Sequence, residues 1–445
     1  MEDDRAPARG LGVLDGSLIV VGSIVGAGIF LVSGDMAKLV RSPAAFLLTW
    51  LLGGGVALSG ALSNGELGGL FPRSGGEYVY LREAYGPSLG FLSGWTSFWI
   101  AFPGSIASLA AGLGATVADM FGWQSVWAPR AVGGLAIAAL TAINALGLQP
   151  GKWTQNVLSV VKLLAFAGLL GLGVLVHRDT PSGLTPFFAP GDRAGGVATA
   201  LIPALFAYSG WNAATYVSGE MRDPRRSLGR ALALGTAVCV ALYLAINTAY
   251  LRAMPLSGLS HAREPARAAA LLLGGDTAAA VLSPLVAVCV LSSMQASVLV
   301  GPRIYHAMAS DRLFFAPLGR LSAQSVPLVS LLAQGVISLA LLMSGRFEEL
   351  VRFTMSAIIA FSTLTVAAVI VLRVRRPAVE RVFRVPGYPW VPLLFIAVNV
   401  WMLWSVLTYA DSSPREALFG LAIVATGVPA YAAFRARARP QETSR

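Results

Sequence analysis

The sequence predicts an all-α, polytopic membrane protein with twelve transmembrane helices. Of its 445 residues, 56% are hydrophobic and only 12% are charged, which is too few charged side chains to cover a water-exposed surface. The mean hydropathy is +0.68. Apolar stretches long enough to cross the ~30 Å hydrocarbon core of a bilayer, about 20 residues each, recur along the whole chain. Because lipid cannot hydrogen-bond to the backbone, these stretches are expected to form helices.

The twelve expected spans are the apolar runs that lie between short polar connections. An even number of spans places both termini on the same side of the membrane. In chain order, the expected spans cover residues 11–37, 43–71, 88–120, 127–147, 153–176, 196–221, 227–253, 277–308, 327–344, 348–373, 389–410 and 414–434. The longest polar connections, about 177–194 and 254–276, are too short for a soluble domain, so the chain is expected to be one membrane domain.

The Lys and Arg residues indicate the orientation. With the N-terminus inside, the inner connections hold about twice as many of them as the outer ones. The inner excess comes from clusters at 222–230, 373–384 and 435–439. We therefore expect a cell inner (plasma) membrane protein with both termini in the cytoplasm. The first ten residues are polar and mixed in charge, and no small-residue cleavage site follows the first apolar run, so we expect no removed signal peptide.

Composition and spacing exclude several other classes of protein. The net charge of +11 lies in short connections and forms no basic stripe, so nucleic acid is not an expected partner. Cys239 and Cys289 fall inside apolar runs, and the three histidines are far apart, so we expect no disulfide, metal or cofactor. No reactive cluster typical of an enzyme is present. A channel or membrane receptor remains as the alternative from another class, although no filter loop is recognisable.

A glycine cluster interrupts the first expected span. Gly22-Ser23-Ile24-Val25-Gly26-Ala27-Gly28-Ile29-Phe30 lies about fifteen residues into the apolar run, close to the middle of the bilayer. Glycine lowers the cost of unwinding a helix, and unwound backbone at that depth must line a cavity. A close helix contact through Gly22 and Gly26 is the simpler alternative. A nucleotide-binding glycine loop agrees less well with the sequence, because no strand precedes the glycines.

The sixth expected span has a matching interruption. Phe206-Ala207-Tyr208-Ser209-Gly210-Trp211-Asn212 lies about thirteen residues past the start of its span. Interrupted helices in corresponding positions of two five-helix halves are typical of inverted-repeat transporters, whose substrates bind at the midplane. Exposed N–H groups at one half-helix end attract a carboxylate, and exposed carbonyls at the other attract an ammonium group. A zwitterionic α-amino acid matches such a site.

The chain resembles the amino acid, polyamine and organocation (APC) superfamily, and within it the bacterial permeases that are similar to L-type amino acid transporters (LAT). The resemblance extends from about residue 11 to the tenth span, and the last two spans match only as apolar helices. The matching motifs are Gly26-Ala27-Gly28-Ile29-Phe30, Gly65-Glu66-Leu67-Gly68, Phe71-Pro72-Arg73-Ser74-Gly75-Gly76-Glu77-Tyr78, Ala84-Tyr85-Gly86-Pro87, the span-six motif above and Gly219-Glu220-Met221-Arg222-Asp223-Pro224-Arg225-Arg226.

This resemblance implies the LeuT-type architecture, a 5+5 inverted repeat with two accessory helices. The expected segments are a cytoplasmic segment (1–10), the first repeat (11–176), the second repeat (196–373), the accessory spans (389–434) and a cytoplasmic tail (435–445). The family's substrate site is built from the unwound segments of spans one and six, and spans three, eight and ten complete it. On this sequence the expected substrate-binding residues are Ile24, Gly26, Ala27, Gly28, Phe206, Ala207, Tyr208, Ser209 and Gly210.

Lys162 lies about ten residues inside the fifth expected span. A lysine at a helix centre costs about 2.5–3.5 kcal/mol on insertion scales, so it is expected to face the protein interior and to have a partner. The resemblance implies that its ammonium takes the place of the sodium ion that coupled relatives hold between spans one and eight. Ser292 and Ser293 fall where hydroxyl ligands of that ion would lie. Tyr243 matches a tyrosine proposed to link the lysine region to span one, and structural packing is its alternative role. A lysine with only a topological role is the alternative.

Several other residues have two interpretations. Glu66, Arg73, Glu77 and Glu220 lie at cytoplasmic helix ends, where we expect gate or loop-fixing pairs. The aromatic residues of span three, Trp99 and Phe102, are interpreted either as pocket walls or as packing.

The expected function is sodium-independent transport of neutral L-amino acids, small ones in particular, by alternating access. Spans one, three, six, eight and ten contain no Asp or Glu near mid-depth, so a cationic side chain would lack a counter-ion. Exchange and proton-linked transport both remain open. Cationic or broad-range amino acids and polyamines are the alternative substrates. The connection 121–130 has no cysteine, so the disulfide-linked heavy chain of animal relatives is not an expected partner.

Overall fold

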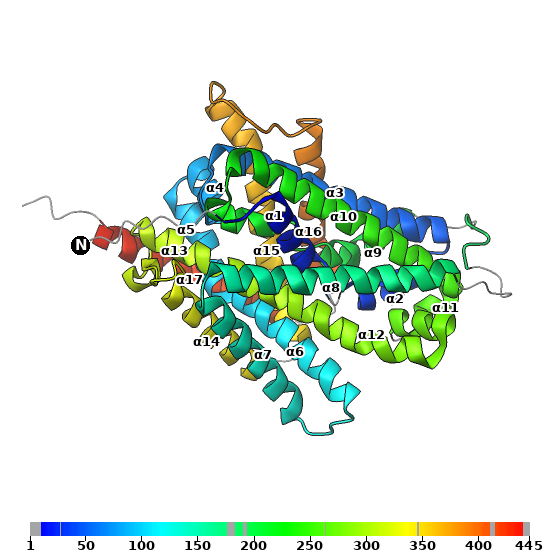
Figure 1. Cartoon of the computed structure of the whole chain (residues 1–445). Coiled ribbons are helices and arrows are strands. Elements are labelled where there is room, and N and C mark those ends of the chain that lie inside the picture. Colours follow the sequence, from blue (N-terminus) through cyan, green and yellow to red (C-terminus); the bar gives the residue numbers. More distant parts are fainter. Residues whose placement is uncertain are drawn as a thin grey trace, which may run out of the picture.

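The computed structural model describes residues 10–26, 28–175, 183–189, 194–262, 264–344, 347–409 and 414–438. Within these residues the regular structure is helical, apart from one isolated parallel bridge between Leu11 and Met221. The expected all-α class is therefore confirmed for the described part of the chain. Figure 1 shows the helices as one bundle.

The helices follow the expected spans closely. The first half of the chain contains α1 (Val13–Ile24), α2 (Gly28–Leu39), α3 (Pro43–Leu70), α4 (Glu77–Tyr85), α5 (Pro87–Thr96), the π-helical turn η1 (Ser97–Ala101), α6 (Phe102–Met120), α7 (Trp127–Ala145) and α8 (Leu148–Leu175). The second half contains α9 (Ala194–Ala207), the 3-10 helix η2 (Ala213–Glu220), α10 (Pro224–Ala253), α11 (Leu256–His261), α12 (Pro265–Val300), α13 (Pro302–Ser310), the 3-10 helix η3 (Ala316–Gly319), α14 (Leu328–Ser344), α15 (Phe347–Arg375), α16 (Trp390–Tyr409) and α17 (Pro414–Ala438).

Six helical segments in the described residues are long and apolar enough to cross a membrane. They are Pro43–Leu70, Pro87–Met120, Trp127–Ala145, Pro224–Ala253, Pro284–Ser310 and Ile358–Arg375. Two of the shorter apolar helices, α1 and α9, are halves of expected spans one and six. A break near the middle of a span leaves each half too short to cross the bilayer alone.

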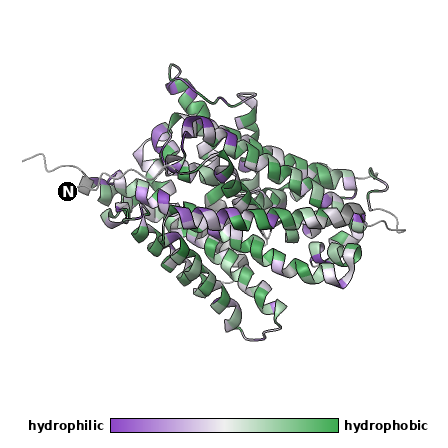
Figure 2. Ribbon diagram, viewed as in Figure 1, coloured by the Kyte–Doolittle hydropathy of each residue, from purple (hydrophilic) through white to green (hydrophobic). Residues whose placement is uncertain are grey.

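Apolar side chains on the outside of the bundle support a lipid environment. Leu135, Leu164, Val336 and Trp404 are 72%, 66%, 65% and 64% exposed. Figure 2 shows hydrophobic residues along the lengths of the helices, with hydrophilic residues more frequent near the end that holds α4, α5 and α13. Such a surface is unfavourable in water and favourable in a bilayer. The chain is therefore a multi-pass membrane protein.

Two of the expected connections contain helices. The segment 254–276 was expected to be a polar connection, but it contains α11 and the beginning of α12, which starts at Pro265 and is interrupted at Gly275, where φ is +67°. Proline is favoured in the first turn of a helix, so Pro265 is compatible with the start of α12. The charged residues next to Pro265 made this helical segment resemble a loop in the sequence. The connection after span two also contains a helix, α4, which the polar residues of its sequence concealed.

The first span lies at the centre of the bundle. α1 packs against α8, α10 and α12, while α2 packs against α9 (Figure 1). The two ends of the described chain lie at the same end of the bundle, which we call the N-terminal end (Figure 1). There Gly10 donates its backbone N–H to the carbonyl of Glu220, and Phe434 of α17 packs on Phe315, 5.0 Å between ring centroids. This arrangement agrees with an even number of membrane crossings.

Candidate functional site

The first span is broken where the glycine cluster predicted it. α1 ends at Ile24 and α2 begins at Gly28. Between them the N–H of Gly26 bonds to the carbonyl of Ile24, 2.9 Å away, in a turn tighter than a helical one. Ala27, which was expected to bind substrate, lies outside the described residues. The last carbonyls of α1 therefore need partners from other helices.

Lys162 supplies those partners from α8. Its side chain is completely buried, and its ammonium donates to the carbonyls of Gly22, at 3.1 Å, and of Val25. The buried position and the need for a partner, which the insertion cost predicted, are both found here. The lysine places a fixed positive charge at the C-terminal end of α1, where the helix dipole favours a cation.

The two serines of α12 differ in their contacts. The Ser293 hydroxyl donates to the carbonyl of Gly22 at 2.8 Å and lies 3.3 Å from that of Val25, so it shares both acceptors with Lys162. Ser292 is buried as well, but its hydroxyl has no hydrogen-bond partner among the described residues. The structure thus brings the Ser293 hydroxyl to the carbonyls of the break, while that of Ser292 makes no such contact.

The sixth span is broken as well, between Ala207 at the end of α9 and Ala213 at the start of η2. Gly210 has φ of +99°, a conformation that other residues rarely adopt. A Cβ atom at Gly210 would lie 2.8 Å from the Cβ atom of Ser23, and one at Gly28 would lie 3.2 Å from the Cα atom of Ala207. The two breaks are therefore in contact, and glycine permits the close approach.

Tyr243 of α10 bridges the two breaks. Its hydroxyl lies 2.9 Å from the carbonyl of Ile24 and 3.0 Å from that of Ala207, so it can donate to either. The ring packs edge-on against Trp50 of α3 and tilted against Tyr208. The expected link to span one is found, and a link to span six accompanies it.

The side chain of Tyr208 faces the neighbouring helices. Its ring packs against Trp50, and its hydroxyl has no hydrogen-bond partner among the described residues. Tyr208 and Ser209 also line a cavity of about 40 Å³ between α3, α9, α15 and α16, which the side chain of Ser362 borders as well. That volume holds a few water molecules at most, and is too small for an amino acid. The break therefore offers mainly backbone groups to a ligand.

The aromatic residues of span three separate into two environments. Trp99 is 37% exposed and packs on Trp95 and Phe98. Phe102 packs edge-on against Tyr216 of η2, 5.2 Å between ring centroids. Phe102 therefore approaches span six, and Trp99 does not.

Three of the four charged residues expected to pair at helix ends do so at the N-terminal end. Glu220 forms a buried ion pair with Arg303, at 2.8 Å, and Arg73 pairs with Asp311 at 3.3 Å. Burial alone would raise the pKa of the Asp311 carboxyl, but hydrogen bonds from Arg82 and Tyr78 hold that pKa below its usual value. These contacts join α4 and η2 to the segment around α13.

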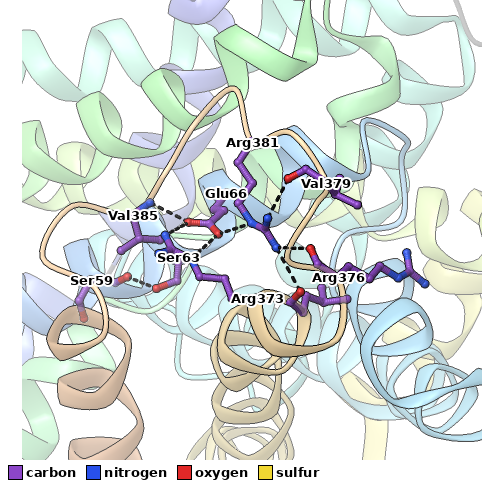
Figure 3. A network of polar contacts seen from close by, with 9 residues as sticks. Ser59, Ser63, Glu66, Arg373, Arg376, Val379, Arg381 and Val385 are labelled. Carbon is purple, nitrogen blue, oxygen red and sulfur yellow. Dashed lines mark hydrogen bonds and ion pairs between the residues drawn. The ribbon is translucent and has the colours of Figure 1, made fainter.

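Glu66, the third of these residues, is the centre of a larger network. Figure 3 shows its carboxylate between Arg373, Arg381 and the backbone N–H of Val385. The carboxylate oxygens lie 2.6 Å from a guanidinium nitrogen of Arg373, 3.2 Å from one of Arg381 and 2.8 Å from the nitrogen of Val385. The network fastens α3 to the end of α15 and to the connection that follows.

Glu77 departs from the expectation. It is 7% exposed, and its Oε1 accepts hydrogen bonds from the Asn212 amide at 2.9 Å and the Ser362 hydroxyl at 3.0 Å. A carboxylate from α4 thus contacts Asn212, the last residue of the span-six break, which the positions along the sequence did not reveal. The sequence feature that could have indicated this contact is the preceding Gly75-Gly76 pair. Both glycines have positive φ, and a Cβ atom at Gly76 would clash with the ring of Tyr216.

Comparison with known proteins agrees with this geometry. The model of the amino acid permease family matches residues 11–428. The serine/threonine exchanger SteT of Bacillus subtilis (strain 168) is 30% identical over 98% of this chain and 99% of its own length. The b(0,+)-type amino acid transporter 1 of Mus musculus is 28% identical over 95% of this chain and 87% of its own. The large neutral amino acids transporter small subunit 2 of Homo sapiens is 28% identical over 97% of this chain and 83% of its own.

Proposed function

Because the chain belongs to the amino acid permease family, it is a membrane transporter of amino acids and not an enzyme, and we propose that it exchanges small neutral amino acids without sodium. The observation that supports sodium independence best is the contact of Lys162 and Ser293 with the carbonyls of Gly22 and Val25. A fixed ammonium satisfies the carbonyls that would otherwise attract a cation. The protein then needs no bound ion to hold the broken end of α1 in place.

The proposed architecture is a LeuT-type 5+5 inverted repeat within twelve spans. Its first repeat covers residues 11–176 and its second 196–373, and the spans in 389–434 are accessory. The breaks in α1/α2 and α9/η2 support this proposal, because they occur in the first helix of each proposed repeat and contact one another. In this arrangement, alternating access is movement of the repeats around a fixed site between the breaks.

The proposed substrate site is the backbone of both breaks, residues 24–28 and 206–210. The first turn of α2 has N–H groups without helical partners, which suit the α-carboxylate of a substrate. The carbonyls at the ends of α1 and α9 suit its ammonium group. Tyr243 supports both carbonyl ends, so its role is to position the site and not to contact the substrate.

The identity of the substrate side chain is proposed from the relatives and from charge. SteT is named as a serine/threonine exchanger and covers nearly the whole chain. The described residues at the two breaks offer one positive charge, Lys162, and its ammonium already donates to backbone carbonyls. A neutral side chain therefore needs no counter-ion in this site.

Cationic substrates are the second candidate, because Glu77 lies closer to the span-six break than its position in the sequence suggested. Its carboxylate contacts Asn212, two residues after Gly210. If it served as the counter-ion for a cationic side chain, excess arginine would inhibit serine uptake, and Glu77→Gln would abolish that inhibition. Inhibition by unlabelled serine and threonine alone supports the neutral assignment.

The proposed location is the cell inner membrane, with both termini in the cytoplasm. The distribution of Lys and Arg residues supports this orientation. We also propose that the chain works without a disulfide-linked heavy chain, because residues 121–130 contain no cysteine.

Exchange in proteoliposomes tests the function. Purified protein is reconstituted with or without unlabelled serine inside, and uptake of labelled serine is measured in sodium and in choline medium. We expect uptake that saturates, requires internal substrate and is unchanged in choline. Loss of uptake in choline would refute sodium independence. Flux that neither saturates nor shows counterflow would support a channel, and substrate binding without flux would support a receptor.

A further inference from the structure

Glu77 is a buried carboxylate that is held only by neutral donors. Its two hydrogen-bond partners, Asn212 and Ser362, are an amide and a hydroxyl, and no cation pairs with it in the part of the chain that the structure describes. Glu66 and Glu220 are buried as well, yet each pairs with arginine. A buried carboxylate without a cation is strongly disfavoured in its ionised form.

The groups around Glu77 do not supply the missing charge. Tyr80 of α4 and Tyr216 of η2 are the titratable residues that face it, and neither is a cation. The charged neighbours on α4 are engaged elsewhere, Arg82 with Asp311 and Glu83 with Arg376. From α15, the neighbour that reaches it is the hydroxyl of Ser362.

The carboxyl group is consequently protonated in a substantial fraction of molecules near pH 7, where an ordinary glutamate is ionised. Burial raises the pKa of Glu77 to about 7, and the hydrogen bonds from Ser362 and Asn212 lower it only in part. α4 lies outside the candidate membrane spans, at the N-terminal end. Water at that end would hydrate the group if the surrounding helices separated.

Glu77 also joins three parts of the chain at the N-terminal end. Its own helix α4, the end of the span-six break and α15 meet at its Oε1 atom. In this structure the end is closed around it. Ser218 donates to the carbonyl of Arg73 at 2.6 Å, and the N–H of Gly219 donates to the hydroxyl of Ser74 at 3.1 Å.

We propose that Glu77 is a proton-binding site that takes up a proton when the N-terminal end closes around it and releases that proton when the end opens. This inference rests on the proposed function, because it assigns the proton site to the alternating-access movement. A small cavity lies next to the site, since Ser362 both borders that cavity and donates to Glu77. The pH would then shift the equilibrium between the form that is closed at the N-terminal end and the form that is open there.

The direction of the pH dependence follows from proton linkage. The closed form has a pKa of about 7, whereas a hydrated glutamate has the ordinary value of 4.5. Between those values the closed form holds one proton more than the open form. As the pH rises through this window, the ratio of closed to open molecules therefore falls about tenfold for each pH unit. The ratio is constant above and below the window.

Two measurements on the full chain test this proposal. Infrared spectroscopy in detergent follows the protonated carboxyl band between about pH 4 and pH 9, and needs no transport. We expect a carboxyl that titrates near neutral pH and disappears in Glu77→Gln. Serine exchange in proteoliposomes is then measured while the pH on the side of the N-terminal end is varied. We expect wild-type rates to change at least severalfold between about pH 5 and pH 7 and to be constant above.

Matched variants separate a proton site from a structural role. Glu77→Gln keeps an oxygen acceptor for Asn212 and Ser362, so it is expected to transport with a flat pH profile. Glu83→Gln, a paired surface carboxylate of the same helix, is expected to keep the wild-type profile and the infrared band. The same pH dependence in Glu77→Gln, or no titrating carboxyl near neutral pH in the wild type, would overturn the proposal. Failure of serine exchange in every variant, with the infrared titration intact, would instead count against the proposed function.

Discussion

Removal of the Lys162 charge is the most informative perturbation of the proposed site. Lys162→Met keeps most of the side-chain volume but leaves the carbonyls of Gly22 and Val25 with Ser293 as their remaining side-chain donor. A hydrogen bond to a charged group contributes about 1.5–3 kcal/mol. A loss of about 1.5–3 kcal/mol from the conformation that binds substrate corresponds to a roughly 10- to 150-fold slower exchange.

The cost to folding is expected to be smaller than the cost to transport. Burying a lysine within a membrane span costs about 2.5–3.5 kcal/mol on insertion scales, and the methionine variant avoids that cost. Lys162→Met should therefore reach the membrane and unfold at a temperature close to that of the wild type. Serine exchange is measured per amount of reconstituted protein, and thermal unfolding is measured on the same preparation.

Lys38→Met is the matched control. Lys38 is an exposed lysine of α2 that pairs with Asp35 at 2.7 Å, and an exposed pair contributes little. We expect wild-type exchange from this variant. Wild-type exchange from Lys162→Met would refute the reasoning, because the ammonium would then have no part in holding the broken end of α1. A Lys162→Met variant that fails to fold would show instead that the charge is structural.

Three further predictions test the rest of the site. Tyr243→Phe keeps the ring packing but removes a hydroxyl that contributes about 0.5–1.5 kcal/mol, so serine exchange should slow by up to roughly tenfold and the free energy of unfolding should fall by no more than about 1.5 kcal/mol. Gly210→Ala places a Cβ atom against the first span at positive φ and should abolish exchange, whereas Gly55→Ala, at an open position of α3, should exchange normally. Arg303→Met leaves Glu220 buried without its partner and should destabilise the protein by about 3–5 kcal/mol in thermal or denaturant unfolding, and a second change, Glu220→Gln, should recover part of that loss.

The positions of both helix breaks could be predicted from the sequence because their causes are local. Glycine at Gly26 and Gly28 makes the helix easy to unwind, and Gly210 occupies a backbone conformation that requires glycine. The membrane class was predictable for a similar reason, since hydropathy over about 20 residues depends only on neighbouring residues. The burial of Lys162 followed from its insertion cost.

The partners of these residues could not be predicted, because helix faces are assigned by packing. Ser292 and Ser293 are adjacent, yet successive residues point about 100° apart around a helix, so only one of them can face the break. The rotation of α12 that selects Ser293 depends on how the helix packs against α1 and α8. In the same way, the second acceptor of Tyr243 becomes visible only when α9 is placed beside α1.

The sequence by itself determined a membrane protein with interrupted first and sixth spans and a buried lysine, since hydropathy, glycine content and insertion cost are properties of short segments. Only the tertiary structure decided that Glu77 lies against the span-six break. Its helix sits in a polar connection, where a glutamate is ordinarily hydrated or paired. Gly75 and Gly76 turn the chain so that α4 approaches η2, and α15 arrives from more than 280 residues away to donate the second hydrogen bond. The environment of that carboxylate, and so its protonation, depends on segments that are distant along the chain and adjacent only in the folded bundle.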